Sequence, residues 1–310
     1  MKTLIFFAII ILPSFGGVGG GLFAQITLIP DSNFEQALID LGIDSDGIVN
    51  GQVLTSDVEE VDVLDVSYEG ILDLTGLQDF IALEILNISG NGFSNGINLS
   101  NNTQLKYLDV HLSDVHSIDL SNNVLLEYLY ITDNELEELD ISNNALLIEL
   151  YCGNPSELLY NRITLLDISN NLNLEALHAN NIPELTTIKL KNNNNQILTN
   201  VLLTCLIEGF ECNTQLCIEV DDVNAAIAGE FPYSNWIVHY CCTTYSEECS
   251  LGIPSFNNTG MSVYPNPAID ELFIYNPTAG TIEVGLYNVS GKLVLQKEFN
   301  NTNNTLNISD

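Results

Sequence analysis

The stretch from Leu126 to Leu146 reads LEYLYITDNELEELDISNNAL, and much of the chain repeats its pattern. Its apolar residues Leu126, Leu129 and Ile131 form an L-x-x-L-x-I anchor, and a second apolar group ends at Ile141. Similar anchors also begin at Val61, Leu83, Leu105, Leu147 and Leu174. Successive anchors are therefore 22, 22, 21, 21 and 27 residues apart. Periods of this size indicate a solenoid of leucine-rich type, in which stacked units share one continuous core.

Each unit also has a second strand-like segment, and no unit has room for a full helix as well. Most of these segments are followed by Ser-Asn-Asn, at residues 100–102, 121–123, 142–144 and 169–171. Ser and Asn close turns by bonding to nearby backbone, and a residue that recurs at each level can form an internal ladder. We therefore expect a structural role for these residues in a mainly β solenoid.

The composition excludes some classes of partner. The 310 residues include 41 acidic and 7 basic ones, a formal net charge of -34, and the basic residues are not clustered. Phosphate neutralisation needs grouped Lys and Arg, so the sequence argues against nucleic acid as a partner and disfavours an anionic membrane surface. Such acidity is typical of a solvated, self-repelling surface and otherwise suits basic partners or divalent cations.

Residues 1–24 have the features of a secretory signal peptide. Lys2 precedes an apolar run from Leu4 to Leu12, and Ala24 stands at the expected cleavage point. No later segment is long enough for a transmembrane helix. We divide the rest into an N-terminal cap (25–60), leucine-rich repeats (61–195), a cysteine-rich C-terminal cap (196–250), a linker (251–260) and a final β domain (261–310).

The N-terminal cap is expected to contain one amphipathic helix from Asp31 to Gly42, in which Ser32 and Glu35 have capping-box spacing. The next residues, 44–50, resemble the middle of a calcium loop, with Asp44, Asp46 and Asn50 as weak candidate ligands. An EF-hand loop needs an acid or amide at its first position and Glu at its twelfth, where this chain has Gly and Val. An Asp/Gly turn without a cofactor is the simpler interpretation.

The chain has seven cysteines, and Cys152 takes the place of an aliphatic anchor residue, so we expect a buried free thiol there. The other six gather after the repeats, at Cys205, Cys212, Cys217, Cys241, Cys242 and Cys249. An even set in an exported chain indicates disulfides that seal the cap, with 15 possible connectivities for six cysteines. Zinc is the weaker interpretation, because C-x-x-C pairs and nearby His ligands are missing.

These repeats resemble the short leucine-rich repeats of secreted bacterial proteins related to internalins. Cys217-Ile-Glu-Val-Asp-Asp222, the later Asn235-Trp236 and a cysteine near 241 resemble that family's C-terminal cap. The resemblance implies a disulfide from Cys217 to Cys241 or Cys242. The 27-residue step departs from the pattern and contains an insertion at about 155–160. We expect a loop there, and such loops often lie near a binding face.

The final domain resembles the C-terminal sorting domain of the type IX secretion system, a small β-sandwich that opens with Tyr-Pro-Asn-Pro, here residues 264–267. The resemblance implies the secretion machinery as a partner and a location at the cell surface or in the medium. The family's final strands and basic tail would follow Asp310, so we expect an incomplete sandwich. A chain that ends there should remain in the periplasm.

In a leucine-rich solenoid, the residues on either side of each inward anchor point outward onto the concave face, because side chains alternate along a strand. One column is Val63, Ile85, Tyr107, Tyr128, Glu149 and Ala176, and the next is Asp65, Asn87, Asp109, Tyr130, Tyr151 and His178. A third column contains His111. The sequence predicts a ligand-binding patch made of Tyr107, Asp109, His111, Tyr128, Tyr130, Glu149, Tyr151 and His178. Tyrosines also favour strands and cross-strand stacking without a ligand, which is the competing interpretation.

Enzyme motifs such as H-E-x-x-H, G-x-S-x-G, a phosphate loop and a Cys supported by His are missing from the sequence. We therefore expect a non-enzymatic, exported protein that binds a protein or polysaccharide through its concave face, in adhesion or surface recognition. One alternative is a passive surface or stalk component without a ligand. A weaker alternative is an unrecognised hydrolase of surface polymers, for which Asp109 and His111 are the nearest approach to an acid/base pair.

Overall fold

The computed structural model describes residues 25–155, 160–204, 215–239, 243–249, 262–264, 271–275, 281–287, 293–299 and 303–307. The chain divides into two units, Met1–Cys249 and Ser250–Asp310. The expected signal peptide, the linker, most of the insertion loop and Cys205, Cys212, Cys241 and Cys242 lie outside the described residues. In the part that the structure describes, no helix combines the length and apolar character that a membrane span requires.

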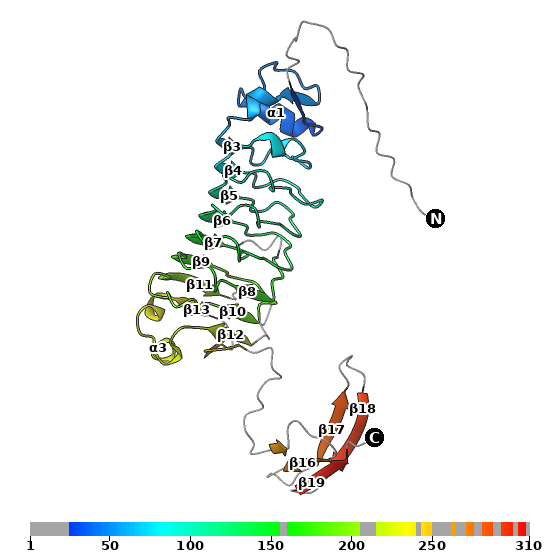
Figure 1. Cartoon of the computed structure of the whole chain (residues 1–310), viewed down its shortest axis with the longest axis vertical. Helices are drawn as coiled ribbons and strands as arrows, with labels where there is room; N and C mark the ends of the chain where they lie inside the picture. Colours follow the sequence, from blue (N-terminus) through cyan, green and yellow to red (C-terminus); the bar gives the residue numbers. More distant parts are fainter. Residues whose placement is uncertain are drawn as a thin grey trace, which may run out of the picture. The chain divides into compact units, whose positions relative to one another are not determined.

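The first unit is a leucine-rich solenoid with a parallel sheet along one side, as the repeat spacing predicts (Figure 1). Its strands are β3 (Val63–Asp65), β4 (Ile85–Asn87), β5 (Tyr107–Asp109), β6 (Tyr128–Tyr130), β7 (Glu149–Tyr151), β9 (Ala176–His178), β11 (Asn200–Thr204) and β13 (Ile237–His239). Equivalent anchors pair across the sheet, such as Leu108 with Leu129 and Leu129 with Leu150. These leucines are fully buried, so every repeat adds to one continuous core.

A second parallel sheet forms only in the later repeats. It contains β8 (Leu165–Asp167), β10 (Thr187–Lys189), β12 (Leu216–Glu219) and β14 (Thr243–Ser246). The expected second strand is missing from the earlier described repeats, where an isolated bridge joins Ile97 to Ile118. Apolar residues of these segments, such as Leu99, Leu120 and Leu136, are nevertheless buried in the core. The expected C-terminal cap also extends the solenoid, because β11 to β14 continue both sheets beyond residue 195.

A ladder of buried asparagines accounts for the Ser-Asn-Asn triplets. The last Asn of each triplet is buried and donates from Nδ2 to two carbonyl oxygens of the preceding repeat. Asn123 reaches Leu99 O at 3.1 Å and Asn102 O at 2.9 Å, and Asn144 reaches Leu120 O at 3.2 Å and Asn123 O at 2.8 Å. Asn102 and Asn171 bond in the same way. The expected internal ladder is present.

A second asparagine ladder, which the sequence analysis missed, follows the anchors. Asn134 Oδ1 accepts hydrogen bonds from the backbone of Ser113 and Val115, while its Nδ2 donates to Val110 O. Asn91 and Asn161 bridge neighbouring turns in a similar way. The sequence signal for this second ladder is an Asn three residues after the last anchor residue, as in Ile88 to Asn91 and Ile131 to Asn134.

The N-terminal cap contains β1 (Ile26–Leu28), α1 (Ser32–Asp40), β2 (Gln52–Leu54) and α2 (Thr55–Val58), and a short turn η1 (Leu77–Asp79) follows β3. The helix α1 is present as predicted, but the capping box is wrong. Asp31 caps α1 by accepting from the backbone of Asn33 and Phe34, and its other oxygen accepts from Leu72 and Asp73 in the first repeat. Burial alone would raise the Asp31 pKa, but these four backbone bonds lower it.

Glu35 does not cap the helix because its carboxylate is turned into the fold. It is fully buried and accepts hydrogen bonds from the backbone N–H groups of Asn50, Gly51 and Gln52. Phe34, on the core face of α1, stacks at 6.2 Å from Phe80 of the first repeats. The cap thus covers the open end of the solenoid core.

The C-terminal end of the solenoid contains α3 (Val223–Ala228) and η2 (Tyr233–Asn235). Trp236 is buried and donates from Nε1 to Leu198 O at 2.7 Å. The expected link from Cys217 to Cys241 or Cys242 is wrong, because Cys217 is bonded to Cys249. The chain turns after β14, and the Cys249 N–H donates to Glu219 Oε1, which brings the two cysteine Cα atoms to 5.9 Å. Cys152 is a buried free thiol as expected, and burial raises its pKa to about 12.

The second unit is a small two-sheet β domain. Its strands are β15 (Ser262–Tyr264), β16 (Glu271–Tyr275), β17 (Ile282–Tyr287), β18 (Leu293–Phe299) and β19 (Asn303–Asn307). The antiparallel order β15-β16-β19 forms one sheet and the β17-β18 pair the other. Ile274, Phe299 and Leu306 form a shared core. Strand β19 is not predicted from the sequence, because its Asn-rich segment has few residues that favour strands.

The first prediction concerns the asparagine ladder. Replacing Asn144 with Ala leaves the carbonyls of Leu120 and Asn123 without the donor that they share. We expect the free energy of unfolding to fall by about 1–3 kcal/mol, because two buried hydrogen bonds are lost while each carbonyl keeps its bond from a backbone N–H. Asn143→Ala is the matched control, because this neighbour is exposed. Urea unfolding of both variants measures the difference, and equal midpoints would show that the ladder does not stabilise the stack.

The second prediction concerns the Cys217–Cys249 disulfide, which joins residues 32 apart in sequence. A Cys217→Ser/Cys249→Ser double variant should lose roughly 2–4 kcal/mol, because the unfolded chain is no longer constrained. Hydrogen exchange should accelerate first in β12 and β14 and then in β10. Protection in β4 should stay unchanged, because each repeat contacts mainly its neighbours. Uniform acceleration from β4 to β14 would contradict this local effect.

Candidate binding surface on the eight-stranded sheet

The outward side of the eight-stranded sheet is the expected concave face, and we call it the strand face. Strands β5, β6 and β7 each present a buried central anchor between two half-buried outward residues, since side chains alternate along a strand. The pairing places Tyr107 beside Tyr128, and Tyr130 beside Tyr151. Tyr151 is in turn beside His178. The two predicted columns are therefore adjacent columns of the sheet.

Five rings make contact along the strand face, and we call them the aromatic row: Tyr107, Tyr128, Tyr130, Tyr151 and His178. The Tyr130 ring centre lies 5.3 Å from that of Tyr107 and 4.8 Å from that of Tyr151, where the rings are stacked. The His178 ring lies 4.2 Å beyond Tyr151, and Tyr128 lies 6.3 Å from Tyr107. These distances are typical of favourable aromatic contacts, so the rings hold one another in place.

A carboxylate fixes the centre of the aromatic row. The Tyr130 hydroxyl donates to Glu149 Oε2 at 2.7 Å, a charge-assisted hydrogen bond. Burial raises the pKa of Tyr130, and the Glu149 carboxylate raises it further, because both disfavour the phenolate. Burial also raises the pKa of Tyr107 and Tyr151. Tyr107, Tyr130 and Tyr151 are therefore neutral phenols beside a carboxylate.

The remaining predicted residues form a second group at the edge of the row. His111 Nδ1 lies 2.7 Å from Asp109 Oδ1, and His111 Nε2 lies 3.0 Å from the hydroxyl of Tyr68. Tyr68 was missed by the sequence analysis because it follows β3 rather than lying on it. Its backbone has a positive φ of 60°, and the residue is 63% exposed. This geometry turns the Tyr68 ring toward His111, whose ring centre is 6.1 Å away.

The strand face is aromatic and acidic. None of its eight strands contains Lys or Arg, while Asp65, Asp109 and Glu149 all project from it. Asn87 Nδ2 donates to Asp65 Oδ2 at 3.1 Å, which holds one of these carboxylates in place. A face of this kind attracts cationic groups and repels anionic ones.

The candidate calcium ligands Asp44, Asp46 and Asn50 form a hydrogen-bonded turn. Asp46 Oδ1 accepts from the Ile48 backbone and its Oδ2 accepts from Asn50 Nδ2, while Asp44 Oδ1 accepts from the Asp46 backbone. Burial raises the pKa of Asp44, and the nearby carboxylates of Asp46 and Glu35 raise it further. These bonds match the Asp/Gly turn interpretation, and Val53 at the position of the missing twelfth ligand is buried in the core.

Residues 262–310 match the family described as the secretion system C-terminal sorting domain. The second unit is a sorting domain. This finding confirms the type IX assignment of the tail and indicates a secreted or cell-surface location. Export by this route requires the secretion machinery as a partner.

The fold is similar to that of solved internalins from Listeria monocytogenes. The functional domain of InlJ, described as including a cysteine ladder, is 21% identical with a TM-score of 0.48, over 72% of this chain and 53% of that chain. Internalin InlF is 19% identical with a TM-score of 0.42, over 73% of this chain and 60% of that chain. Internalin C2 is 17% identical with a TM-score of 0.41, over 73% of this chain and 100% of that chain. This chain thus spans only about half of the InlJ domain. A comparison with curated proteins finds no match.

The third prediction concerns the Tyr130–Glu149 hydrogen bond. The pKa of Tyr130 is raised above its ordinary value of 10.0 in the folded state. The protonated Tyr130 therefore stabilises the fold below pH 10, and this contribution is lost as the pH rises through the folded-state pKa. Tyr130→Phe removes both the bond and the titration. The stability difference between the wild type and this variant should be largest near neutral pH and should shrink above pH 10. Urea unfolding at several pH values measures it, and a constant difference would refute the assignment.

Proposed function

We propose that this exported protein binds a basic segment of a protein ligand on its strand face. The observation that carries the proposal is the aromatic row with its carboxylates Asp109 and Glu149. Tyrosine combines a large apolar contact area with a polar tip and loses little conformational entropy on binding, so it is enriched at binding hot spots. Because the row is held by its own ring contacts, binding would require little further ordering.

The arrangement of the rings favours a protein over a polysaccharide. Tyr130 and Tyr151 stack on one another, so these ring faces are partly occupied and are less available to stack on a sugar. The hydroxyl groups and ring edges remain, next to carboxylates and without a nearby Lys or Arg on the strands. Arg and Lys side chains fit such a surface, because carboxylates pair with their charge and aromatic rings contact their apolar stems.

Two other functions predict different behaviour. A passive surface component would use the tyrosines only as cross-strand pairs, and their loss would affect stability alone. A hydrolase would have to act through Asp109 and His111, but His111 is already hydrogen-bonded on both ring nitrogens. The observed contacts therefore favour binding over hydrolysis.

The fourth prediction tests binding. Purified protein is applied to an array of basic, neutral and acidic peptides and to an array of neutral and acidic glycans. We expect retention of basic peptides that weakens as salt is added. Tyr130→Ala and Tyr151→Ala should each weaken retention by about thirtyfold, the effect of a hot spot of roughly 2 kcal/mol. The control is Leu172→Ala, which removes an exposed apolar side chain away from the strand face.

The outcomes separate the alternatives. Thermal unfolding is measured in parallel, so that lost binding is not confused with lost folding. Retention of glycans but not peptides would replace a protein ligand with a polysaccharide. Retention that is unchanged in both tyrosine variants would exclude the aromatic row as the site. New reducing ends or peptides released from the arrays would instead indicate hydrolysis.

A further inference from the structure

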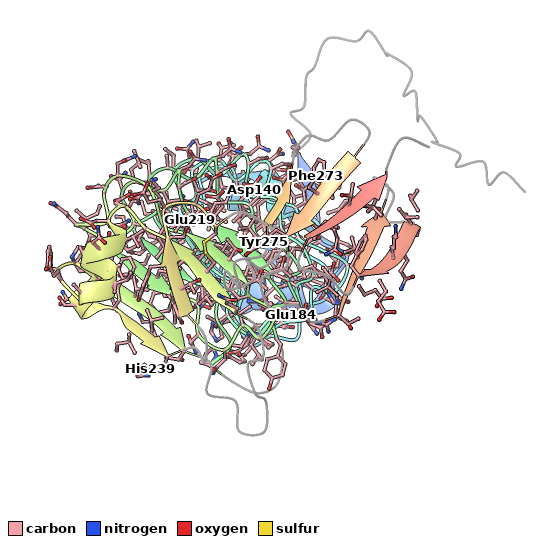
Figure 2. All side chains as sticks on the ribbon, turned by 90° about the horizontal axis from the view of Figure 1, so that it is seen from below. Asp140, Glu184, Glu219, His239, Phe273 and Tyr275 are labelled. Carbon is pink, nitrogen blue, oxygen red and sulfur yellow. A yellow bond between two sulfur atoms is a disulfide. The ribbon has the colours of Figure 1, made fainter. Side chains whose placement is uncertain are left out.

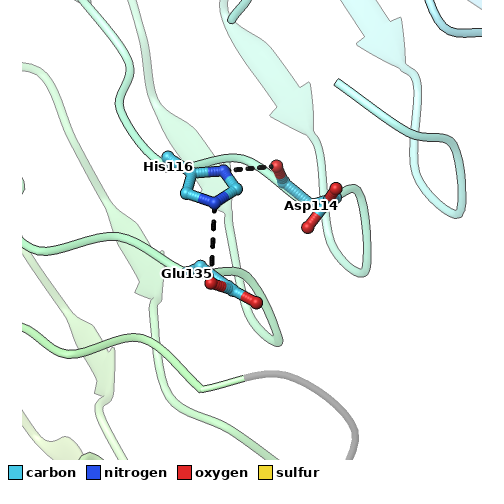
Figure 3. Close-up of side chains that lie close together, drawn as sticks. All are labelled: Asp114, His116 and Glu135. Atoms are coloured by element: carbon cyan, nitrogen blue, oxygen red, sulfur yellow. Dashed lines mark hydrogen bonds and ion pairs between the residues drawn. The ribbon is translucent and has the colours of Figure 1, made fainter. Parts of the chain in front are cut away.

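Asp114, His116 and Glu135 form a cluster away from the strand face, in the turns that follow β5 and β6 (Figure 3). Equivalent buried residues set their positions, since Val115 and Leu136 are core residues of successive repeats. The Asn134 side chain accepts from the Val115 backbone, and the Glu135 N–H donates to Val115 O at 3.0 Å. The two turns are therefore held in register, and Asp114 and Glu135 occupy the same position one repeat apart.

The contacts of His116 leave one ring nitrogen directed toward a carboxylate. His116 Nδ1 lies 3.0 Å from the Asp114 carbonyl oxygen, an acceptor, so Nδ1 carries a proton. His116 Nε2 faces Glu135 Oε2 at 3.5 Å (Figure 3). One ligand atom from each of Asp114, His116 and Glu135 lies within 4.8 Å of the others.

We propose that these three side chains bind a divalent transition metal of the zinc class. The 3.5 Å between Nε2 and Oε2 exceeds the roughly 2.7–2.9 Å of a charge-assisted hydrogen bond. It matches the edge of a tetrahedral site, about 3.4 Å for metal–ligand bonds of about 2.1 Å. The Asp114 carbonyl then orients the imidazole from outside, as second-shell acceptors do for metal-bound histidines. One imidazole and two carboxylates are ligands that zinc accepts, with water in the fourth position.

Arg162, from the following repeat, competes with the metal. Its guanidinium lies 3.3 Å from the same Glu135 oxygen that faces His116. Without a metal, Arg162 balances the Glu135 charge, and with a metal its positive charge opposes binding. The Arg162 side chain is 51% exposed, so it is free to move into solvent when the metal binds. Removal of this charge should therefore strengthen the site.

A metal here would connect successive repeats. Asp114 and His116 belong to the turn after β5, while Glu135 belongs to the turn after β6. Metal binding to the folded state adds stability by mass action, because the three ligands are assembled only when the repeats are stacked. The proposed role is a link between turns, independent of ligand binding on the strand face.

The fifth prediction tests this site with Co²⁺ and Zn²⁺ on metal-stripped, oxidised protein. We expect a tetrahedral Co²⁺ absorption band that Zn²⁺ abolishes, and a rise in the unfolding temperature with Zn²⁺. His116→Ala and Glu135→Gln should each weaken binding more than tenfold, by comparison with the 10- to 100-fold effects of removing second-shell partners. Arg162→Ala should bind the metal severalfold more tightly. His239→Ala is the control, because His239 is an exposed histidine on β13, in a later repeat than the cluster (Figure 2 labels His239).

Several results would overturn the proposal. Absence of metal binding in the wild type would leave Asp114, His116 and Glu135 as a structural ion-pair cluster. Equal affinities of wild type and His116→Ala would assign the metal to other residues, such as cysteines. Failure of Arg162→Ala to tighten binding would contradict the charge argument. Circular dichroism of each variant verifies folding, which should persist because His116 and Arg162 are exposed.

Discussion

The constraint on which the structure depends is the need for hydrogen bonds that hold irregular turns of successive repeats together in a narrow stack. A repeat of 21 or 22 residues is too short to contain both a helix and two strands, so much of its backbone is irregular. The side-chain amides of Asn102, Asn123, Asn144 and Asn171 add hydrogen bonds to buried carbonyls that also accept from backbone N–H groups, and these added bonds join each repeat to the preceding one. With these bonds made, apolar anchors can stack in register at every level.

This regular register produces the surface chemistry. Parallel pairing without slippage places outward residues of successive repeats directly beside one another, so similar residues become columns. The aromatic row and the carboxylate of Glu149 are the product of that arrangement on the strand face. The same regularity brings Asp114 and Glu135 together on another side, because their buried neighbours Val115 and Leu136 are equivalent. Both surfaces thus follow from one repeated backbone geometry.

The two units have separate parts in the proposed function. The solenoid unit holds the large continuous core and the candidate binding surfaces, whereas the tail is a sorting domain with its own small core around Ile274 and Leu306. An exported location also suits the Cys217–Cys249 disulfide, since disulfides persist in oxidising compartments. The acidic surface, with a formal charge of -34, adds solubility and favours cationic partners.

The sequence by itself determined the solenoid, its register, the buried thiol of Cys152 and the nature of the tail, because periodic anchors and a short motif are local features. Tertiary structure decided the rest. Cys217 bonds to Cys249 because of the turn after β14, and Glu35 binds the loop at Asn50 instead of capping its helix. Tyr68 reaches His111, and His116 faces Glu135, through contacts between turns of different repeats. Periodicity specifies which residues are buried, but only the backbone path of each turn determines which exposed side chains meet.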